Sequence, residues 1–198
     1  MAFIYDVPLH PSKVDVLLPW LPRQPWAGGI GDPEQLAAYR FDDPAGEVGV
    51  ETLLLRDGET LVQVPLAYRG APVAELEEYL IGTIDHPVLG QRWVYDAVGD
   101  PVYLAALGDA VLAGAAQAEQ FHEVDEEIVR IEPTLALEWS GGDHGRAPAV
   151  AGPDVVELAT PREPVLLFRR LDPGATVLGR DALLAVVDDL RVQLAAAG

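Results

Sequence analysis

Several residue types are missing or scarce in this sequence, and each absence narrows the chemistry open to the chain. The 198 residues include no cysteine, no asparagine, one lysine (Lys13) and two serines. Without cysteine, disulfides, thiolate metal sites and thiol nucleophiles are excluded. The first twenty residues lack a basic start followed by an apolar run, and no later stretch approaches membrane-spanning length. We therefore expect a cytoplasmic protein.

Basic residues are also few. Thirteen of them stand against 32 acidic residues, which gives a formal net charge of −19 at pH 7. Such a surface repels phosphate backbones and anionic lipid headgroups, so neither nucleic acid nor a membrane is expected as a partner. Because 49% of the residues are hydrophobic, the chain should fold, and its length suits one core or two small subdomains that share one.

Turn and cap residues predict the elements of the first half of the chain. Ser12 precedes an amphipathic stretch, which predicts a helix over residues 12–21. Asp57-Gly58 separates two β-rich runs and predicts a hairpin. The run QRWVYD, residues 91–96, predicts a strand. Asp100-Pro101 then supplies an N-cap and a proline at the first helical position, which predicts a helix that continues to about residue 119.

The second half of the chain reads mainly as strands. Strand-like runs occupy residues 126–139, 149–160 and 163–171, separated by turns that contain proline and glycine. A last amphipathic helix is predicted over residues 180–195. Strands linked mostly by hairpins, beside few helices, indicate an α+β fold with an antiparallel sheet.

Motifs that could carry chemistry are better explained as structure. The glycine-rich run WAGGIGD, residues 26–32, lacks the preceding strand and following lysine of a phosphate loop, so we interpret it as a turn. Ser140, Asp143 and His144 lie close together in sequence but without the glycine-flanked serine of a hydrolase elbow, and we interpret them as a polar surface loop.

Two further groups are assigned to a solvated face and to packing. The acidic run His122, Glu123, Asp125, Glu126 and Glu127 lacks the ligand spacing of a calcium loop or a zinc helix. Aromatic residues that could form a sugar-stacking platform are expected in the core instead: Trp20, Trp26, Trp93, Tyr95 and Tyr103. We assign no catalytic residue, no metal ligand and no cofactor.

Three segments carry a resemblance to a known family. The runs WLPRQPWAGG (20–29), VQVPLAYRGAP (62–72) and IGTIDHPVLGQRWVYDAVGDPVY (81–103) resemble, in order and spacing, the N-terminal cap region of actinobacterial maltokinases. They are closer still to short stand-alone proteins with a maltokinase cap-like sequence, and the resemblance covers about residues 10–112. The residues matching the family are Arg23, Trp26, Gly29, Pro65, Tyr68, Arg69, Trp93, Tyr95, Asp96, Asp100 and Pro101.

The resemblance implies a cystatin-like fold, in which a curved antiparallel sheet wraps around a helix. It places a cap-like domain at residues 1–115, followed by a β-rich extension with a C-terminal helix at residues 116–198 that packs on the first part as one unit. It also implies a context in trehalose, maltose and α-glucan metabolism, where the cap supplies no catalytic residue. The segment 81–103 is expected to be a rigid structural bracket and not a binding site, with Trp93 and Tyr95 on one face of a strand.

Departures from the family weigh against kinase activity. Two basic positions of the family are Ile30 and Asp32 here, and the strand VLLFRRLDPG (165–174) has Leu166 where the family has its nucleotide-binding lysine. The catalytic loop and the metal-binding aspartate segment of a kinase are not found, and phosphoryl transfer depends on such groups.

Three functions follow from the resemblance. The first is a non-catalytic accessory module that binds a protein partner, such as an α-glucan or trehalose pathway enzyme. The second is a domain that binds a small molecule such as a maltose-like sugar. The third is the N-lobe subunit of a split sugar kinase, against which Leu166 counts.

Overall fold

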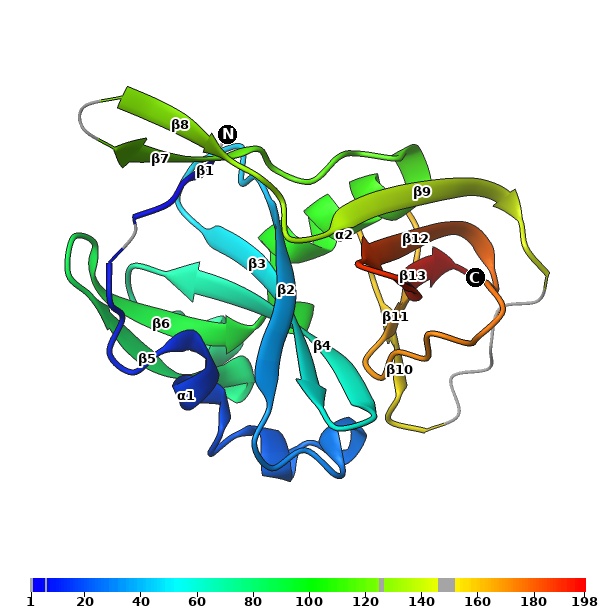
Figure 1. Ribbon diagram of the computed structural model, residues 1–198, viewed down its shortest axis with the longest axis horizontal. Helices are drawn as coiled ribbons and strands as arrows, with labels where there is room; N and C mark the ends of the chain where they lie inside the picture. Colours follow the sequence, from blue (N-terminus) through cyan, green and yellow to red (C-terminus); the bar gives the residue numbers. More distant parts are fainter. Residues whose placement is uncertain (1, 6, 125–126, 146–151) are drawn as a thin grey trace.

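The computed structural model describes residues 2–5, 7–124, 127–145 and 152–198. Two five-stranded antiparallel sheets and the helix α2 (Pro101–Ala113) share one hydrophobic core, and a small three-stranded sheet lies beside them (Figure 1). The predicted α+β class, with mostly antiparallel strands, is confirmed. The cystatin-like wrapping of sheet around helix stays a prediction.

The first sheet follows the strand order β2-β3-β4-β6-β5. Its strands are β2 (Glu34–Phe41), β3 (Gly49–Asp57), β4 (Thr60–Arg69), β5 (Leu80–His86) and β6 (Gly90–Asp96). The predicted Asp57-Gly58 hairpin joins β3 to β4, with Asp57 paired to Thr60 and Gly58 at a φ of +57°. The predicted strand QRWVYD is β6, which pairs with β4 in the same sheet.

The outer face of this sheet is covered by α1 (Lys13–Leu17) and two 3₁₀ turns, η1 (Leu21–Arg23) and η2 (Pro25–Ala27). Ser12 caps α1 as predicted, and its hydroxyl also bonds to Asp15. The helix is shorter than the predicted span because the prolines that follow cannot continue it. Trp20 and Trp26 pack edge to face beneath these turns.

The inner face of the first sheet packs on α2. The 3₁₀ turn η4 (Ala97–Gly99) leads from β6 into the helix, and η3 (Ala74–Tyr79) precedes β5. The helix ends at Gly114, which takes a left-handed φ of +67°, so it is shorter than the predicted helix to residue 119. The predicted packing of the hairpin and β6 on this helix is confirmed by the shared core.

The second sheet follows the order β10-β11-β13-β12-β9. Its strands are β9 (Ala136–Asp143), β10 (Val155–Leu158), β11 (Val165–Phe168), β12 (Arg180–Val187) and β13 (Leu190–Ala197). Each of the three strand-like runs predicted beyond residue 120 contributes strands. Leu167, Leu183 and Leu194 face the same core as Tyr39 and Leu54 of the first sheet.

The helix predicted over residues 180–195 is wrong. Residues 180–197 form the β12–β13 hairpin, in which Val187 pairs with Leu190 across the turn Asp188-Asp189. Both faces of this hairpin are covered: Leu183 and Ala185 face the main core, while Ala182 and Leu184 face a second cluster with Phe168 and Val177. A strand that is buried on both faces loses the alternation of apolar and polar residues, so its sequence resembles a helix rich in alanine and leucine.

The two sheets are joined by main-chain hydrogen bonds as well as by the core. The first half of β4 is not paired with β6, and the segment that leaves β11 bonds to this open edge. Gln63 donates its N–H to Arg169 O at 3.0 Å, and Leu171 donates to Leu61 O at 2.9 Å. The side chain of Gln63 adds two bonds, to the carbonyls of Phe168 and Leu194, each at 2.7 Å.

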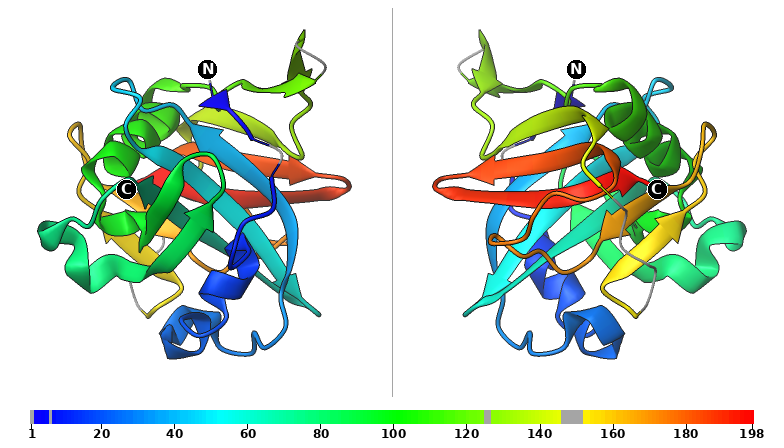
Figure 2. Two further views of the ribbon diagram at one scale, coloured as in Figure 1. Left: turned by 90° about the vertical axis from the view of Figure 1, so that its left-hand side faces the viewer. Right: turned by 90° about the vertical axis from the view of Figure 1, so that its right-hand side faces the viewer.

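The third sheet has the order β1-β7-β8. It consists of β1 (Ala2–Phe3), β7 (Gln120–Val124) and β8 (Glu127–Ile131), with β1 parallel to β7. The β7–β8 hairpin projects from the body of the molecule in all three views (Figures 1 and 2). Its strand β8 lies at the edge of the sheet.

Candidate functional site

A bidentate ion pair between Arg69 and Asp100 fastens β4 to the start of α2. The Nε and Nη2 atoms of Arg69 lie 2.8 and 3.0 Å from the two carboxylate oxygens of Asp100, which is fully buried. The same carboxylate accepts the N–H of Val102 at 2.9 Å and thereby caps the helix, while Pro101 occupies the first helical position. Arg69 has a raised pKa because of its hydrogen bonds to Asp100.

The strand β6 is held in place by the residues predicted to form a bracket. Trp93 and Tyr95 face the main core and Val94 faces the outer cluster, as the alternation predicted. The phenol oxygen of Tyr95 accepts the N–H of Val73 at 2.9 Å. Trp93 is only partly buried, so its ring is less enclosed than that of Tyr95.

Arg169, which follows β11, ties the second sheet to β6 and to the tryptophan turn. Its Nη2 lies 2.5 Å from Asp96, and both residues are buried. The guanidinium carbon sits 4.8 Å from the ring centroid of Trp26, a cation–π geometry. Arg170 donates to Gly28 O at 2.8 Å and so holds the glycine turn, in which Gly29 takes a φ of +92°.

Three further residues that match the family are Arg23, Pro65 and Tyr68. Arg23 is exposed and donates to Pro19 O at 3.0 Å. Pro65 is buried in β4 opposite Thr52, at a position that β6 does not pair, where a missing N–H costs no ladder bond. Tyr68 lines a cavity, which the other ten family-matching residues do not.

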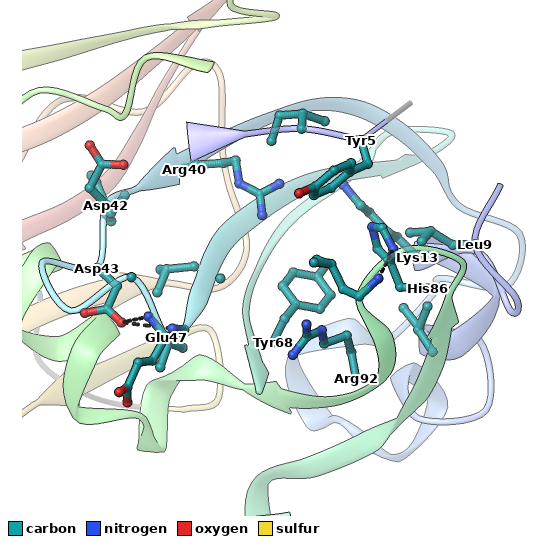
Figure 3. A pocket seen from close by; sticks show the side chains of 18 residues that line it. Tyr5, Leu9, Lys13, Arg40, Asp42, Asp43, Glu47, Tyr68, His86 and Arg92 are labelled. Carbon is teal, nitrogen blue, oxygen red and sulfur yellow. Dashed lines mark hydrogen bonds between the residues drawn. The ribbon is translucent and has the colours of Figure 1, made fainter. Parts of the chain in front are cut away.

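That cavity has a volume of about 370 Å³ and lies at the end of the first sheet, between α1, the start of β3 and the β5–β6 hairpin (Figure 3). We use the name basic cavity for the positively charged end of this space only. The residues that line that end are Lys13, Arg40, Tyr68, His86 and Arg92. Figure 3 shows the side chains of Arg40, Tyr68 and Arg92 near its middle, with Lys13 and His86 beside them. The lining residues come from five separate segments, which only the fold brings together.

A buried carboxylate orders the floor of the basic cavity. Glu51 is 3% exposed and accepts a hydrogen bond from Tyr68 at 3.0 Å. Its Oε1 lies 2.8 Å from the ammonium of Lys13 and 3.2 Å from Arg40. Burial raises the pKa of Glu51, but the charges of Arg40 and Lys13 and the hydrogen bonds from Lys13 and Tyr68 outweigh it, so that the pKa is lowered. Glu51 is therefore ionised.

Arg92 and His86 line the cavity without such a counterion. Among the described residues Arg92 has no ion pair, and its Nε is buried without a hydrogen-bond partner. His86 accepts the N–H groups of Val88 and Leu89 on Nδ1, each at 3.1 Å. Burial, and next the charge of Arg92, lowers the pKa of His86. The ring is thus neutral at pH 7 and carries its proton on Nε2.

Acidic residues line the opposite end of the cavity. Asp42, Asp43 and Glu47 stand apart from Lys13 and His86 in Figure 3. The carboxylate of Asp43 accepts the N–H groups of Ala45, Glu47 and Val48 at 2.9 to 3.0 Å. Partial burial raises the pKa of Asp43, but these bonds and the charge of Arg69 lower it overall. The cavity therefore has a cationic end and an anionic end.

Comparison with known families bears on the first sheet. Residues 20–100 match the family of the maltokinase N-terminal cap domain. The match supports the resemblance of this segment to a maltokinase N-terminal cap domain. The match points to a link with maltose- and trehalose-related α-glucan metabolism, and the cap domain is the non-catalytic N-terminal part of maltokinase. No curated protein matches the chain.

The cap match covers β2 to β6 and the outer turns, and it includes ten of the eleven family-matching residues and most of the basic cavity. The second sheet lies outside the match. The likeness of residues 165–174 to the family strand therefore remains a resemblance, and the boundary at residues 115 and 116 stays a prediction.

Sequence reasoning missed most of the basic cavity. It assigned Tyr68 to the family pattern but gave no role to Arg40, Glu51, His86 or Arg92. The one available signal was Lys13, the single lysine of the chain. In a protein with so few basic residues, a lone lysine is more informative than usual, but no sequence spacing links it to the others.

The other sequence candidates are resolved by the structure. The run 26–32 is a turn, as predicted, and Asp57 accepts the N–H groups of Gly31 and Asp32 there. Four of the five aromatic residues of the suggested platform are buried, which confirms packing: Trp20, Trp26, Tyr95 and Tyr103. The described residues contain no cluster of metal-ligating side chains, and no helix among them is long and apolar enough to cross a membrane.

Ser140 and Asp143 lie in the edge strand β9, so the predicted loop is wrong for these two residues. The reason is that Ala182 and Leu183 of β12 pair with Ser140 and Trp139, which a local reading cannot foresee. His144 Nε2 is 2.9 Å from Ser140 O and 3.1 Å from its hydroxyl, whereas Asp143 accepts the N–H of Gly145. No aspartate bond orients the imidazole among these residues, which a working triad needs.

Two residues within the acidic run lie outside the described part of the chain. Asp125 and Glu126 belong to that undescribed part. Glu123 and Glu127 are exposed on the β7–β8 hairpin, and His122 is partly exposed there. This agrees with a solvated face for the described members.

Proposed function

We propose that the chain is a non-catalytic accessory module of α-glucan metabolism that acts by binding a protein partner. The observation that supports it is the use of the residues shared with the cap family. Arg69, Asp96 and Asp100 are committed to internal ion pairs, and Trp26 and Tyr95 to packing. These residues therefore maintain the fold. A fold to which no catalytic group is assigned suits a protein that presents a binding surface.

Kinase activity has little support in the second sheet. Leu166 stands where the resemblance would put the nucleotide-binding lysine, and its side chain is only 4% exposed. Lys13 is bonded to Glu51 in the first sheet and cannot replace that lysine. A strand without a cation leaves nucleotide phosphates unneutralised. This argument favours the accessory module over the split-kinase subunit.

The β7–β8 hairpin is the surface that best fits a protein partner. Val124, Ile128 and Val129 are 44%, 64% and 40% exposed on it. β8 is the edge strand of its sheet in the described structure, so half of its main-chain groups face outward. Exposed β-branched residues on an open edge favour the addition of a strand from another protein.

We infer that the partner contributes a strand edge with basic residues, carried by an enzyme of α-glucan metabolism. The outward hairpin carries Glu123 and Glu127 beside its apolar residues. The whole chain has a net charge of −19, so a basic partner is attracted and an acidic one is repelled.

The test is a pull-down from the native host with the tagged chain, followed by protein identification. We expect one α-glucan or trehalose pathway enzyme to be enriched by the wild type and lost with Ile128→Asp. The matched control is Val88→Asp, because Val88 is 56% exposed at the β5–β6 turn and lies outside the hairpin. The interaction is then measured with the two purified proteins.

Four outcomes would contradict the proposal. One is the absence of any such enzyme from the captured proteins, and another is equal loss of binding in both variants. Self-association of the chain through Ile128, seen as a dimer in size-exclusion chromatography, would replace the enzyme with a second copy. Formation of phosphorylated maltose from ATP by the pure chain would show that the chain is catalytic.

A small-molecule binding domain is the second candidate, and the cavity in the first sheet favours it. Its rings are Tyr5 and Tyr68 and not the buried tryptophans considered from the sequence. This candidate uses a different surface from the hairpin.

A further inference from the structure

The basic cavity concentrates positive charge in a protein that has little of it. Three of the thirteen basic residues line it: Lys13, Arg40 and Arg92. One carboxylate, Glu51, faces Lys13 and Arg40, so this end keeps a surplus of two positive charges. Like charges are brought together at a cost, which an anionic ligand would remove.

Donors remain available at this end after the internal contacts are made. Lys13 has three N–H donors, of which one is bonded to Glu51. The side chain of Arg92 has no ion pair among the described residues, and its Nε is buried without a hydrogen-bond partner. His86 adds an Nε2–H, because its Nδ1 is occupied by two backbone N–H groups. An unpaired buried donor is costly unless a ligand or water accepts from it.

We propose that the basic cavity binds a small phosphomonoester, a phosphorylated molecule with a hydroxyl-bearing body, through Lys13, Arg40 and Arg92. A phosphomonoester carries close to two negative charges at pH 7 and three strong acceptor oxygens, which matches the surplus charge and the free donors. Guanidinium groups bind two of these oxygens at once, and a lysine supplies a point charge.

The rest of the cavity suits the body of such a ligand. A volume of about 370 Å³ is in the range of small-molecule sites and exceeds what a phosphate group alone would fill. Tyr5 and Tyr68 offer ring surfaces, and Tyr5 is fixed edge to face against His86 at 5.5 Å. At the far end, Glu47 offers carboxylate oxygens that accept from hydroxyl groups but repel a second phosphate. The ligand is therefore oriented, with its phosphate towards Arg92.

The experiment measures binding by isothermal titration calorimetry on the full chain. The probes are glucose 6-phosphate, its neutral counterpart glucose, and inorganic phosphate. We expect saturable binding of glucose 6-phosphate that is at least tenfold tighter than binding of glucose or of inorganic phosphate. Arg92→Gln should weaken it at least tenfold, because this arginine has no structural ion pair to lose.

The matched control is Arg56→Gln. It removes the same charge at the opposite end of β3, outside the cavity lining, and should leave the affinity within twofold of the wild type. Circular dichroism melts of both variants show that each is folded, so a loss of binding is not a loss of structure.

Four results would overturn the proposal. Absence of saturable glucose 6-phosphate binding below about 10 mM would show that the cavity is not a phosphomonoester site. Equal affinity for glucose would exclude phosphate recognition, and equal affinity for inorganic phosphate would exclude a role for the body. Equal loss of affinity in Arg56→Gln and Arg92→Gln would show that the ligand responds only to long-range charge and not to contact with Arg92. The hairpin is a separate surface, so this proposal and the protein-partner proposal can fail independently.

Discussion

At the scale of single residues, Asp100 has two structural roles. It closes the first turn of α2 and it neutralises Arg69, although its own carboxylate has no contact with solvent. Removal of one member of a buried pair costs more than the pair contributes, because the remaining charge stays desolvated. Arg69 is 21% exposed, so water can relieve part of this cost.

We predict that Asp100→Ala lowers the free energy of unfolding by about 3 kcal/mol, through the unpaired arginine and the lost cap. The measurement is urea denaturation followed by far-ultraviolet circular dichroism. The matched control is Asp109→Ala on the same helix, where both Asp109 and its partner Arg162 are about half exposed. That change should cost less than about 1 kcal/mol. Equal costs for the two variants would show that burial does not decide the strength of these pairs.

At the scale of elements, the β12–β13 hairpin shows how a turn can be made from unfavourable residues. Its two turn residues are both aspartates, and Asp188 takes a φ of +50°. Left-handed backbone costs a residue with a Cβ atom more than it costs glycine. The two adjacent negative charges add repulsion at the same place.

We predict that Asp188→Gly raises the free energy of unfolding by about 0.5 kcal/mol, because glycine adopts the positive φ without strain. Asp189→Gly removes the same charge at a residue without a positive φ, so it should lower stability by about 0.5 kcal/mol through added chain flexibility. Chemical denaturation of both variants beside the wild type separates strain from charge. Changes of the same sign and size would mean that charge repulsion alone matters.

At the scale of the whole molecule, the two large sheets depend on each other. One core contains side chains from both sheets and from α2, and the bonds of Gln63 and Leu171 cross between them. Arg169 adds a buried ion pair with Asp96 at this junction. Each sheet alone would expose the apolar face that the other now covers.

We predict that the chain unfolds in one transition, and that Arg169→Ala lowers its free energy of unfolding by about 3 kcal/mol. Tryptophan fluorescence, to which Trp26 beside Arg169 contributes, and circular dichroism, which reports on both sheets, should agree on one midpoint for the wild type and on one lower midpoint for the variant. Arg180→Ala, in an ion pair that is about half exposed, is the control and should cost less than about 1 kcal/mol. Two separate midpoints would show instead that residues 1–115 and 116–198 fold independently.

The sequence by itself determined the features that depend on neighbouring residues. Ser12 and Asp100 were identifiable as helix caps, and Asp57-Gly58 as a hairpin turn, because the side chain or the backbone freedom involved acts within a few residues. The family motifs were also readable over about residues 10–112, and the family match at residues 20–100 supports them.

Only the tertiary structure decided what depends on distant partners. The run at residues 180–197 became a hairpin because both of its faces are covered, which no local pattern reveals. Lys13, Arg40 and Arg92 meet because α1 packs near β5 and because β2 and β6 belong to one sheet, while their sequence spacing carries no signal. Local rules act through short-range hydrogen bonds and backbone preferences, whereas a cavity is formed by long-range strand pairing and burial, which the whole chain determines together.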